Sequence, residues 1–265
     1  MKIFANHAHV FPADIRPEGD IPHLLHLMDE CGIEKAVAFA PFFPQWGDHE
    51  SDPIHWLAKE VHAHPDRLAG YAAINPERAD AIDLLRTAKD LGLQGVKMHP
   101  AFDKWNLKSE QAYRFYEKAE ELSMPLDFHT GVHHYRISQY HPLLFDDIAC
   151  DFPKLKLVFE HVGGYHFFQD MLAVFANHAG SGNLYAGIAS VLSPQKQKYW
   201  YLGPEKIKDL LWQVGEDWLI YGLDFPYNNA EDVKNDLKQI HSLDISDSCR
   251  EKLLGKNLEC LLKSK

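Results

Sequence analysis

Short apolar runs rich in β-forming residues alternate along this chain with longer segments of helical periodicity, and this alternation constrains the fold most. Eight runs occur, at residues 2–10, 35–40, 67–75, 95–100, 125–131, 156–164, 183–190 and 218–226. The segments between them, such as 77–92 and 109–123, place apolar residues at helical spacing and carry Gly or Pro near their ends. A unit of one strand and one helix therefore recurs about every thirty residues.

This repeat predicts an α/β fold, a (β/α)8 TIM barrel, as a single domain over residues 1–265. Alternating strands and helices imply parallel strands, and eight of them close into a barrel with its site at their carboxyl ends. A doubly wound open sheet is the alternative, but HAHVFPADIRP after the first strand lacks the Gly-rich turn typical of that fold. The long segments 41–53 and 192–204 follow strands, so we expect them to form walls of a substrate site.

Charge and cysteine content exclude several classes of function. The 27 basic and 38 acidic residues give a net charge of −11, which argues against attraction to nucleic acid or to an anionic membrane surface. Cys31, Cys150, Cys249 and Cys260 are scattered without a C-x-x-C motif, so neither a disulfide framework nor a cysteine zinc site is expected. The chain has no signal-peptide pattern and no apolar run of membrane length, which predicts a cytoplasmic protein.

Residues that ligate metals or ionise recur at the ends of the predicted strands. His7 and His9 lie two apart in FANHAHVFP, so both side chains face the same side of a strand. His129, His161 and Asp224 end other predicted strands, and a Gly or Pro turn follows each. In a barrel these side chains converge on one mouth without any shift of strand register. Each alone is compatible with chance, but together they predict a metal-dependent active site.

Three further residues are candidates for contact with substrate. Lys97 and His99 share a face of the predicted fourth strand, and Arg136 follows the fifth strand in GVHHYR. Lys97 and Arg136 are cations suited to a substrate carboxylate, which Arg136 can bind through two hydrogen bonds. A hydrogen-bonded position in the barrel wall is the alternative for His99, and a surface salt bridge is the alternative for Arg136. Six other histidines on predicted helices or their ends are expected to be solvated: His23, His26, His62, His64, His178 and His241.

With these motifs the chain resembles the amidohydrolase superfamily, in the TIM-barrel branch of small metal-dependent hydrolases and aminocarboxymuconate-semialdehyde decarboxylase-like enzymes. The motifs are HAH, GVKMHP, DFHTG, EHVGG, YGLDFP and KLLGKNLECLL, and the resemblance covers essentially the whole chain. It implies that a divalent metal is bound by four residues, His7, His9, His129 and Asp224. It also implies that His161 is a catalytic group beside the bound water.

The residue types independently suit a borderline divalent metal, Zn²⁺ first and Mn²⁺ second. Three imidazoles and a carboxylate leave an open position for a water whose pKa falls to about 7 on zinc. Asp224 can accept the proton of that water, and His161 can polarise a substrate carbonyl or move the proton onward. We predict one ion per chain, because the branch that GVKMHP resembles is mainly mononuclear. A carboxylated Lys97 bridging two ions is the alternative. The family usually has an aspartate where this chain has Ala5.

Three functions follow as hypotheses. The first is a metal-dependent hydrolase of a small ester, lactone or amide, including substrates that carry a carboxylate. The second is a metal-dependent non-oxidative decarboxylase of a small unsaturated or aromatic acid, and the third is a barrel without catalysis. Length favours the first, because decarboxylases of this resemblance tend to have longer loops than 265 residues allow. The complete ligand set argues against the third. The predicted partner is a small-molecule substrate, without nucleic acid or membrane, and a homo-oligomer stays open.

Overall fold

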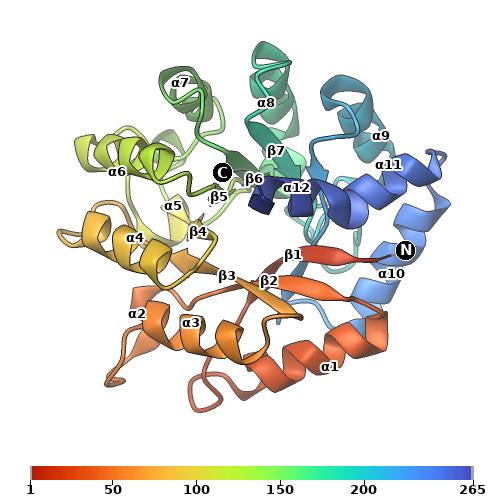
Figure 1. Ribbon diagram of the computed structural model, residues 1–265. Coiled ribbons are helices and arrows are strands. Elements are labelled where there is room, and N and C mark those ends of the chain that lie inside the picture. Colours follow the sequence, from red (N-terminus) through yellow and green to blue (C-terminus); the bar gives the residue numbers. More distant parts are fainter. Residues whose placement is uncertain (1, 264–265) are drawn as a thin grey trace.

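The computed structural model describes residues 2–263, whose strands form one parallel sheet that curls into a nearly closed barrel (Figure 1). The strand order is β8-β7-β6-β5-β4-β3-β2-β1-β9. The strands are β1 (Phe4–His9), β2 (Lys35–Phe39), β3 (Leu68–Ala73), β4 (Gly95–Met98), β5 (Leu126–His129), β6 (Leu157–Glu160), β7 (Leu184–Gly187), β8 (Leu219–Ile220) and β9 (Gly222–Phe225). The prediction of a TIM barrel is confirmed.

The last predicted strand, 218–226, is divided into β8 and β9, so nine strands appear where eight runs were predicted. β8 pairs with β7, and β9 pairs with β1. Between the two halves, the backbone N–H of Tyr221 donates to the carbonyl of Leu253, at 3.1 Å, rather than to a neighbouring strand. One interrupted strand therefore joins both ends of the sheet and closes the ring.

Helices surround the strands and alternate with them along the chain (Figure 1). The α-helices are α1 (Ile21–Cys31), α2 (Phe43–Trp46), α3 (Pro53–Ala63), α4 (Ala81–Asp90), α5 (Pro100–Asp103), α6 (Glu110–Glu121), α7 (Leu144–Asp151), α8 (Gly164–Asn177), α9 (Gly203–Val214), α10 (Ala230–Ser242), α11 (Asp247–Glu251) and α12 (Asn257–Lys263). Single turns of other helix types are η1 (Pro17–Gly19), η2 (Ile137–Gln139), η3 (His161–Gly163) and the π-helical η4 (Lys252–Lys256). None of the helices between residues 2 and 263 has both the length and the apolarity to cross a bilayer.

Local sequence sets the ends of these helices. The side chain of Asp20 accepts a hydrogen bond from the backbone N–H of His23 at the start of α1, and Gly32 ends the helix with φ 68°. Ser109 caps α6 in the same way, through the N–H of Ala112. Such caps satisfy N–H groups that have no partner inside the helix, and left-handed backbone favours glycine. The predicted helical segments 77–92 and 109–123 thus form α4 and α6.

Helix α12 covers the amino-terminal end of the barrel, where it crosses the ring of strands in Figure 1. Leu258 and Leu261 pack in one buried cluster with Val37, Tyr71 and Ile220 of the barrel. Burial of each such side chain stabilises the fold by about 1.5–3 kcal/mol. Because α12 covers this end of the strands, their carboxyl ends are left as the open face of the barrel.

Candidate active site

The carboxyl ends of the strands surround a cavity of about 380 Å³. It is lined by His7, His9, Phe42, Gln45, Lys97, His99, Phe102, His129, His133, His161, Gln197, Trp200, Asp224 and Tyr227. The long segments 41–53 and 192–204 contribute Phe42 and Trp200 to its walls, as expected for loops that follow strands. A larger cavity, about 540 Å³, lies beside β1 and α12 at the other end and contains none of the predicted site residues. The smaller cavity is therefore the candidate active site.

Strand β1 is irregular where its two histidines lie. Its register shifts between Ala5 and Ala8 against β2, and between Asn6 and Ala8 against β9. His7 has φ 63°, a left-handed conformation that is uncommon outside glycine. Phe4 packs against the cluster inside the barrel and Ala5 in the cluster outside it. Asn6 bonds to side chains inside the barrel, and the bulge lets His7, the next residue, enter the barrel as well. The expectation that the side chains converge without a shift of register is wrong for this strand, because a bulge redirects them.

Three other residues of the site share this left-handed conformation. The φ angles are 64° at His161, 53° at Ser190 and 53° at Asp224. Each such residue costs about 1–3 kcal/mol and persists only where its surroundings hold it in place. These four strained residues lie together around the candidate site. At each of them the left-handed backbone gives the side chain a direction that a regular strand would not.

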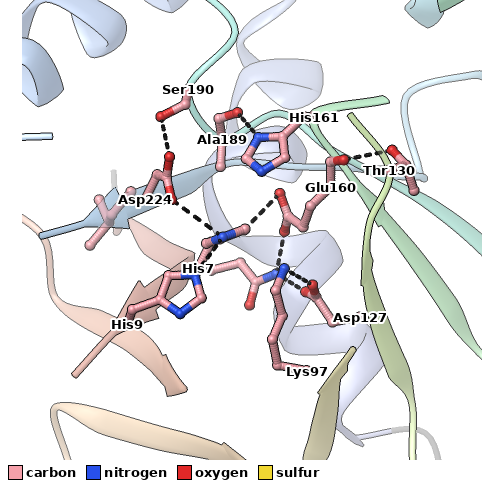
Figure 2. A network of polar contacts seen from close by, with 12 residues as sticks. His7, His9, Lys97, Asp127, Thr130, Glu160, His161, Ala189, Ser190 and Asp224 are labelled. Atoms are coloured by element: carbon pink, nitrogen blue, oxygen red, sulfur yellow. Dashed lines mark hydrogen bonds and ion pairs between the residues drawn. The ribbon is translucent and has the colours of Figure 1, made fainter. Parts of the chain in front are cut away.

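His7, His9 and Asp224 bring three ligand atoms together (Figure 2). Nε2 of His7 lies 3.1 Å from Nε2 of His9 and 3.4 Å from Oδ1 of Asp224. All three side chains are buried. Burial lowers the pKa of both histidines well below the ordinary value, with smaller effects from the nearby Lys97 and His161. Neutral imidazoles keep lone pairs for a metal, so two such rings and one carboxylate fit a borderline divalent ion.

The carboxylate of Asp224 is oriented by two residues that the sequence analysis did not single out. Ser190 Oγ donates a 2.6 Å hydrogen bond to Asp224 Oδ2, and Asn228 Nδ2 donates a 2.8 Å bond to Ser190 Oγ. Burial raises the pKa of Asp224 to about 6, partly offset by the bond from Ser190. Ser190 ends the run NLYAGIAS after β7, so its place at a strand end was the available signal.

His161 is fixed in one tautomer beside this group. Its Nδ1 lies 2.7 Å from the carbonyl oxygen of Ala189, and because a carbonyl can only accept, Nδ1 carries the hydrogen. The other ring nitrogen, Nε2, is therefore an acceptor, and the ring centre is 5.1 Å from that of His7 (Figure 2). Trp200 stacks on the ring at 4.5 Å. Burial lowers the pKa of His161 to about 3, so the ring is neutral.

His129 and His99 lie next to His161 as a stacked pair. Their ring centres are 4.0 Å apart, and His129 is 4.8 Å from His161. Nε2–H of His129 donates to the carbonyl of Gly131, at 3.1 Å, while Nδ1 of His99 accepts from the N–H of Phe102. His129 does not belong to the compact group of His7, His9 and Asp224. Its role as a ligand, and contact of His99 with substrate, stay predictions.

A buried polar network lies beneath the candidate ligands (Figure 2). Lys97 Nζ donates to Asp127 Oδ1 at 2.8 Å, and Asn6 Nδ2 bonds to both Asp127 and Glu160 at 2.7 Å. Burial raises the pKa of Asp127 to about 7, although Lys97 opposes the rise. Asp127 was missed from the sequence, yet it lies two residues before His129 on β5, and this spacing places both on one face.

Glu160 connects this network to the first histidine. Its Oε2 lies 3.2 Å from Nδ1 of His7, on the side of the ring opposite the candidate metal ligands. Gly187 of β7 leaves the room, because a Cβ there would lie 2.3 Å from Cδ of Glu160. Ala5, where the family usually has an aspartate, is buried on the same strand as His7. Ala5 has no carboxylate to contact His7. In this chain the carboxylate beside His7 comes instead from Glu160 on β6.

Arg136 lies apart from the other predicted residues. It is exposed at the start of η2 and does not line the cavity. Within the described residues the cavity has one basic side chain, Lys97, and that amine is already paired with Asp127. Substrate binding by Arg136 and by Lys97 therefore stays a prediction.

Comparison with known proteins assigns the chain to a class. The amidohydrolase family matches residues 7–262, so the chain belongs to that family. Among solved structures, a dihydroxybenzoic acid decarboxylase from Polaromonas sp. JS666 with bound manganese and the inhibitor 2-nitroresorcinol is similar, with TM-score 0.72, 17% identity, and coverage of 99% of this chain and 97% of the other.

A protein from Pseudomonas putida assigned as a 2-pyrone-4,6-dicarboxylic acid hydrolase has TM-score 0.73 and 18% identity, with coverage of 98% of this chain and 97% of the other. Both likenesses are to the fold. A curated relative, isopentenyl-diphosphate Delta-isomerase II of Clarkia xantiana, is 33% identical over 89 residues, and the match spans 32% of this chain and 28% of that protein. The amidohydrolase family supports an enzyme that uses a divalent metal, in line with the group of His7, His9 and Asp224.

Proposed function

We propose that this protein is a metal-dependent hydrolase that attacks a small ester, lactone or amide, including substrates that carry a carboxylate. The observation that carries the proposal is the fixed tautomer of His161. Its Nδ1–H is held by the carbonyl of Ala189, so the nitrogen on the side of His7 accepts a proton rather than donating one. Hydrolysis needs such a group to take a proton from water, whereas decarboxylation needs a donor to carbon.

The residues that would hold the metal are His7, His9 and Asp224, with His129 as a predicted fourth ligand. When bound there, a divalent ion supplies Lewis-acid polarisation and a water of lowered pKa. Zn²⁺ is the first choice for this donor set and Mn²⁺ the second. Ser190 orients the carboxylate of Asp224, and Glu160 contacts the far nitrogen of His7. These contacts hold the ligand atoms toward one point.

The buried charge supports one ion per chain. Lys97, Asp127, Glu160 and Asp224 together carry a net charge of −2 when all are ionised, which one divalent ion balances. The alternative of two ions needs a carboxylated Lys97. The contacts of Lys97 instead favour a positive amine, because Nζ lies 2.8 Å from Asp127 Oδ1 and 5.0 Å from the ring centre of Phe39.

The walls of the cavity suit a small planar substrate. Phe42, Phe102, Trp200 and Tyr227 present rings to a space of about 380 Å³. His161 Nε2 faces the ligand group and can accept a proton and pass it to a leaving oxygen or nitrogen. The cytoplasmic location and the absence of nucleic-acid or membrane partners remain predictions.

A decarboxylase of a small aromatic or unsaturated acid is the second candidate. The observation that favours it is the same ring of flat side chains, which fits an aromatic acid, and one protein of similar fold is a dihydroxybenzoic acid decarboxylase. On this hypothesis His161 would have to carry the transferred proton before the reaction begins, whereas hydrolysis starts from the neutral tautomer and protonates the ring only transiently.

The test is to incubate the metal-loaded protein with lactones, esters, amides and aromatic acids while following acid release and CO₂ together. The proposal expects acid release without CO₂. The variant His161→Asn keeps a side-chain donor for Ala189 but has no imidazole base, so kcat should fall by about 10²- to 10⁴-fold with metal content unchanged. CO₂ release without hydrolysis would contradict the proposal, as would full turnover in His161→Asn.

A further inference from the structure

We propose a second metal site on the outside of the barrel, formed by Asp146, Cys150 and His178, for a thiophilic divalent ion of the Zn²⁺ class. It is independent of the candidate active site. Helices α7 and α8 are neighbours in the outer ring (Figure 1). Asp146 and Cys150 belong to α7, and His178 follows the last residue of α8.

The chain brings the three side chains together by two routes. Asp146 and Cys150 are four residues apart on one helix, so they lie one above the other on the same face. The chain then continues through β6 and α8, and His178, at the end of α8, lies against the face of α7 that carries Asp146 and Cys150. His178 Nε2 lies 2.9 Å from Asp146 Oδ1 and 3.9 Å from Cys150 Sγ, and one ligand atom from each residue lies within 4.8 Å of the others.

These separations approach those of a tetrahedral zinc site. With Zn–S near 2.3 Å and Zn–N and Zn–O near 2.0–2.2 Å, two ligand atoms are separated by about 3.2–3.6 Å. The two observed distances bracket this range, and the third separation, between Asp146 and Cys150, is within 4.8 Å. Shifts of up to about 1 Å would therefore bring the three ligand atoms to a common ion. Three protein ligands from different residue types leave the fourth position to water, as sites with an open position do.

Two further contacts favour a cation at this place. Asn177 Nδ2 donates a 2.7 Å hydrogen bond to Asp146 Oδ1, which holds the carboxylate as an orienting neighbour of a ligand would. The side chain of His178 is nine-tenths buried, so its ring is held against Asp146 rather than turned to solvent. Desolvation raises the pKa of the Cys150 thiol, and the negative charges of Asp146, Asp151 and Asp147 around it add to the rise.

Binding exchanges one proton for the ion. The thiol of Cys150 loses its proton to solvent as the sulfur–metal bond forms. His178, now the donor to Asp146, moves its ring hydrogen from Nε2 to Nδ1 and offers the freed lone pair. Affinity should therefore fall as the pH is lowered. The bound ion would join α7 to α8 and stabilise the folded state in proportion to its concentration.

Cobalt provides a selective test, because the candidate active site has nitrogen and oxygen ligands and no sulfur. Metal-free full-length protein is titrated with Co²⁺ while the near-ultraviolet thiolate-to-cobalt charge-transfer band is recorded. One equivalent of cobalt beyond the ion that the candidate active site binds should produce the band, and Zn²⁺ should displace it. The band should be absent in Cys150→Ser and require at least tenfold more cobalt in His178→Ala. It should be unchanged in Cys260→Ser, a matched change at another exposed cysteine.

A second measurement does not depend on colour. Saturating Zn²⁺ should slow alkylation of Cys150 by iodoacetamide at least tenfold, while hydrolytic activity of Cys150→Ser stays at the wild-type level. Three results would overturn the site: no thiolate band in wild-type protein at saturating Co²⁺, a band of full intensity in Cys150→Ser, or equal cobalt affinity in His178→Ala.

Discussion

At the scale of single residues, we expect the tautomer of His7 to depend on Glu160. A carboxylate at 3.2 Å from Nδ1 favours the hydrogen on that nitrogen and leaves Nε2 free to bind a metal. In Glu160→Gln the amide can still accept from Asn6, but its NH₂ group would face Nδ1 and favour the hydrogen on Nε2. We expect metal affinity to fall about 10- to 100-fold, measured by competition with a chelator.

The variant Glu160→Gln also shows whether Glu160 positions His7 for the metal or only stabilises the fold. Glu160 is buried near Asp127, so removing one negative charge should not lower the melting temperature of the metal-free protein. The exposed change Glu117→Gln on α6 is the control and should alter neither quantity. Unchanged metal affinity in Glu160→Gln, or a large loss of stability without metal, would show that Glu160 only supports the fold.

At the scale of secondary-structure elements, strand β7 leaves space for a side chain of β6. Gly187 pairs with Glu160 across the two strands, and a Cβ at Gly187 would lie 2.3 Å from Cδ of Glu160. Gly187→Ala should displace this carboxylate and lower metal affinity as Glu160→Gln does, with a loss of stability of about 1–3 kcal/mol from overpacking. Chemical denaturation and chelator competition measure the two effects.

A double variant assigns the cause of that clash. Replacing Glu160 by Ala in the Gly187→Ala background removes the contact, so stability should return while metal affinity stays low. If stability does not return in the double variant, Gly187 is needed for a reason other than the room it leaves for Glu160.

The sequence was informative about elements and less so about the contacts between them. Parallel strands and the end of the barrel that carries the site follow from alternation of apolar runs with helical segments. The bulge in β1, which lets Asn6 and His7 both face inward, leaves no mark in the residue pattern, because His7 and His9 keep the spacing of a regular strand. The division of the last strand at Tyr221 depends likewise on Leu253, a residue distant in sequence.

The candidate site shows the same limit. Strand ends identified His7, His9, His161 and Asp224 as neighbours, since the barrel topology brings all strand ends to one rim. Pairings such as Lys97 with Asp127 depend on side-chain reach across strands, which the sequence does not specify.

At the scale of the whole molecule, buried ionisable groups make stability depend on pH in opposite directions. Burial lowers the pKa of His7 and His9, so their contribution to stability is lost as the pH falls through the ordinary histidine range. Burial raises the pKa of Asp236 on α10 to about 7, and its Oδ1 has no hydrogen-bond partner. This group stabilises the folded state fully below the pKa of the unfolded chain and loses that contribution as the pH rises through 7.

Comparison of Asp236→Asn with wild type isolates the contribution of this carboxyl group to the pH dependence of stability, because both proteins contain the same buried histidines. The variant should gain roughly 1–4 kcal/mol of unfolding free energy over wild type at pH 8 and much less at pH 5. Denaturant titrations at both pH values measure the difference, and Asp244→Asn at an exposed site is the control. An equal effect at both pH values would mean that Asp236 is ionised in the folded protein throughout.

Metal content of the purified protein tests the central claim most directly. The measurement is made in the Cys150→Ser background, so that an ion at the proposed outer site is not counted, and compares this protein with versions that also carry His7→Ala or Asp224→Ala. We predict one divalent ion per chain in the parent, with both metal and hydrolytic activity lost in each of the other two. Full metal content in either variant would show that its residue is not a ligand, and two ions per chain in the parent would contradict the single-ion site.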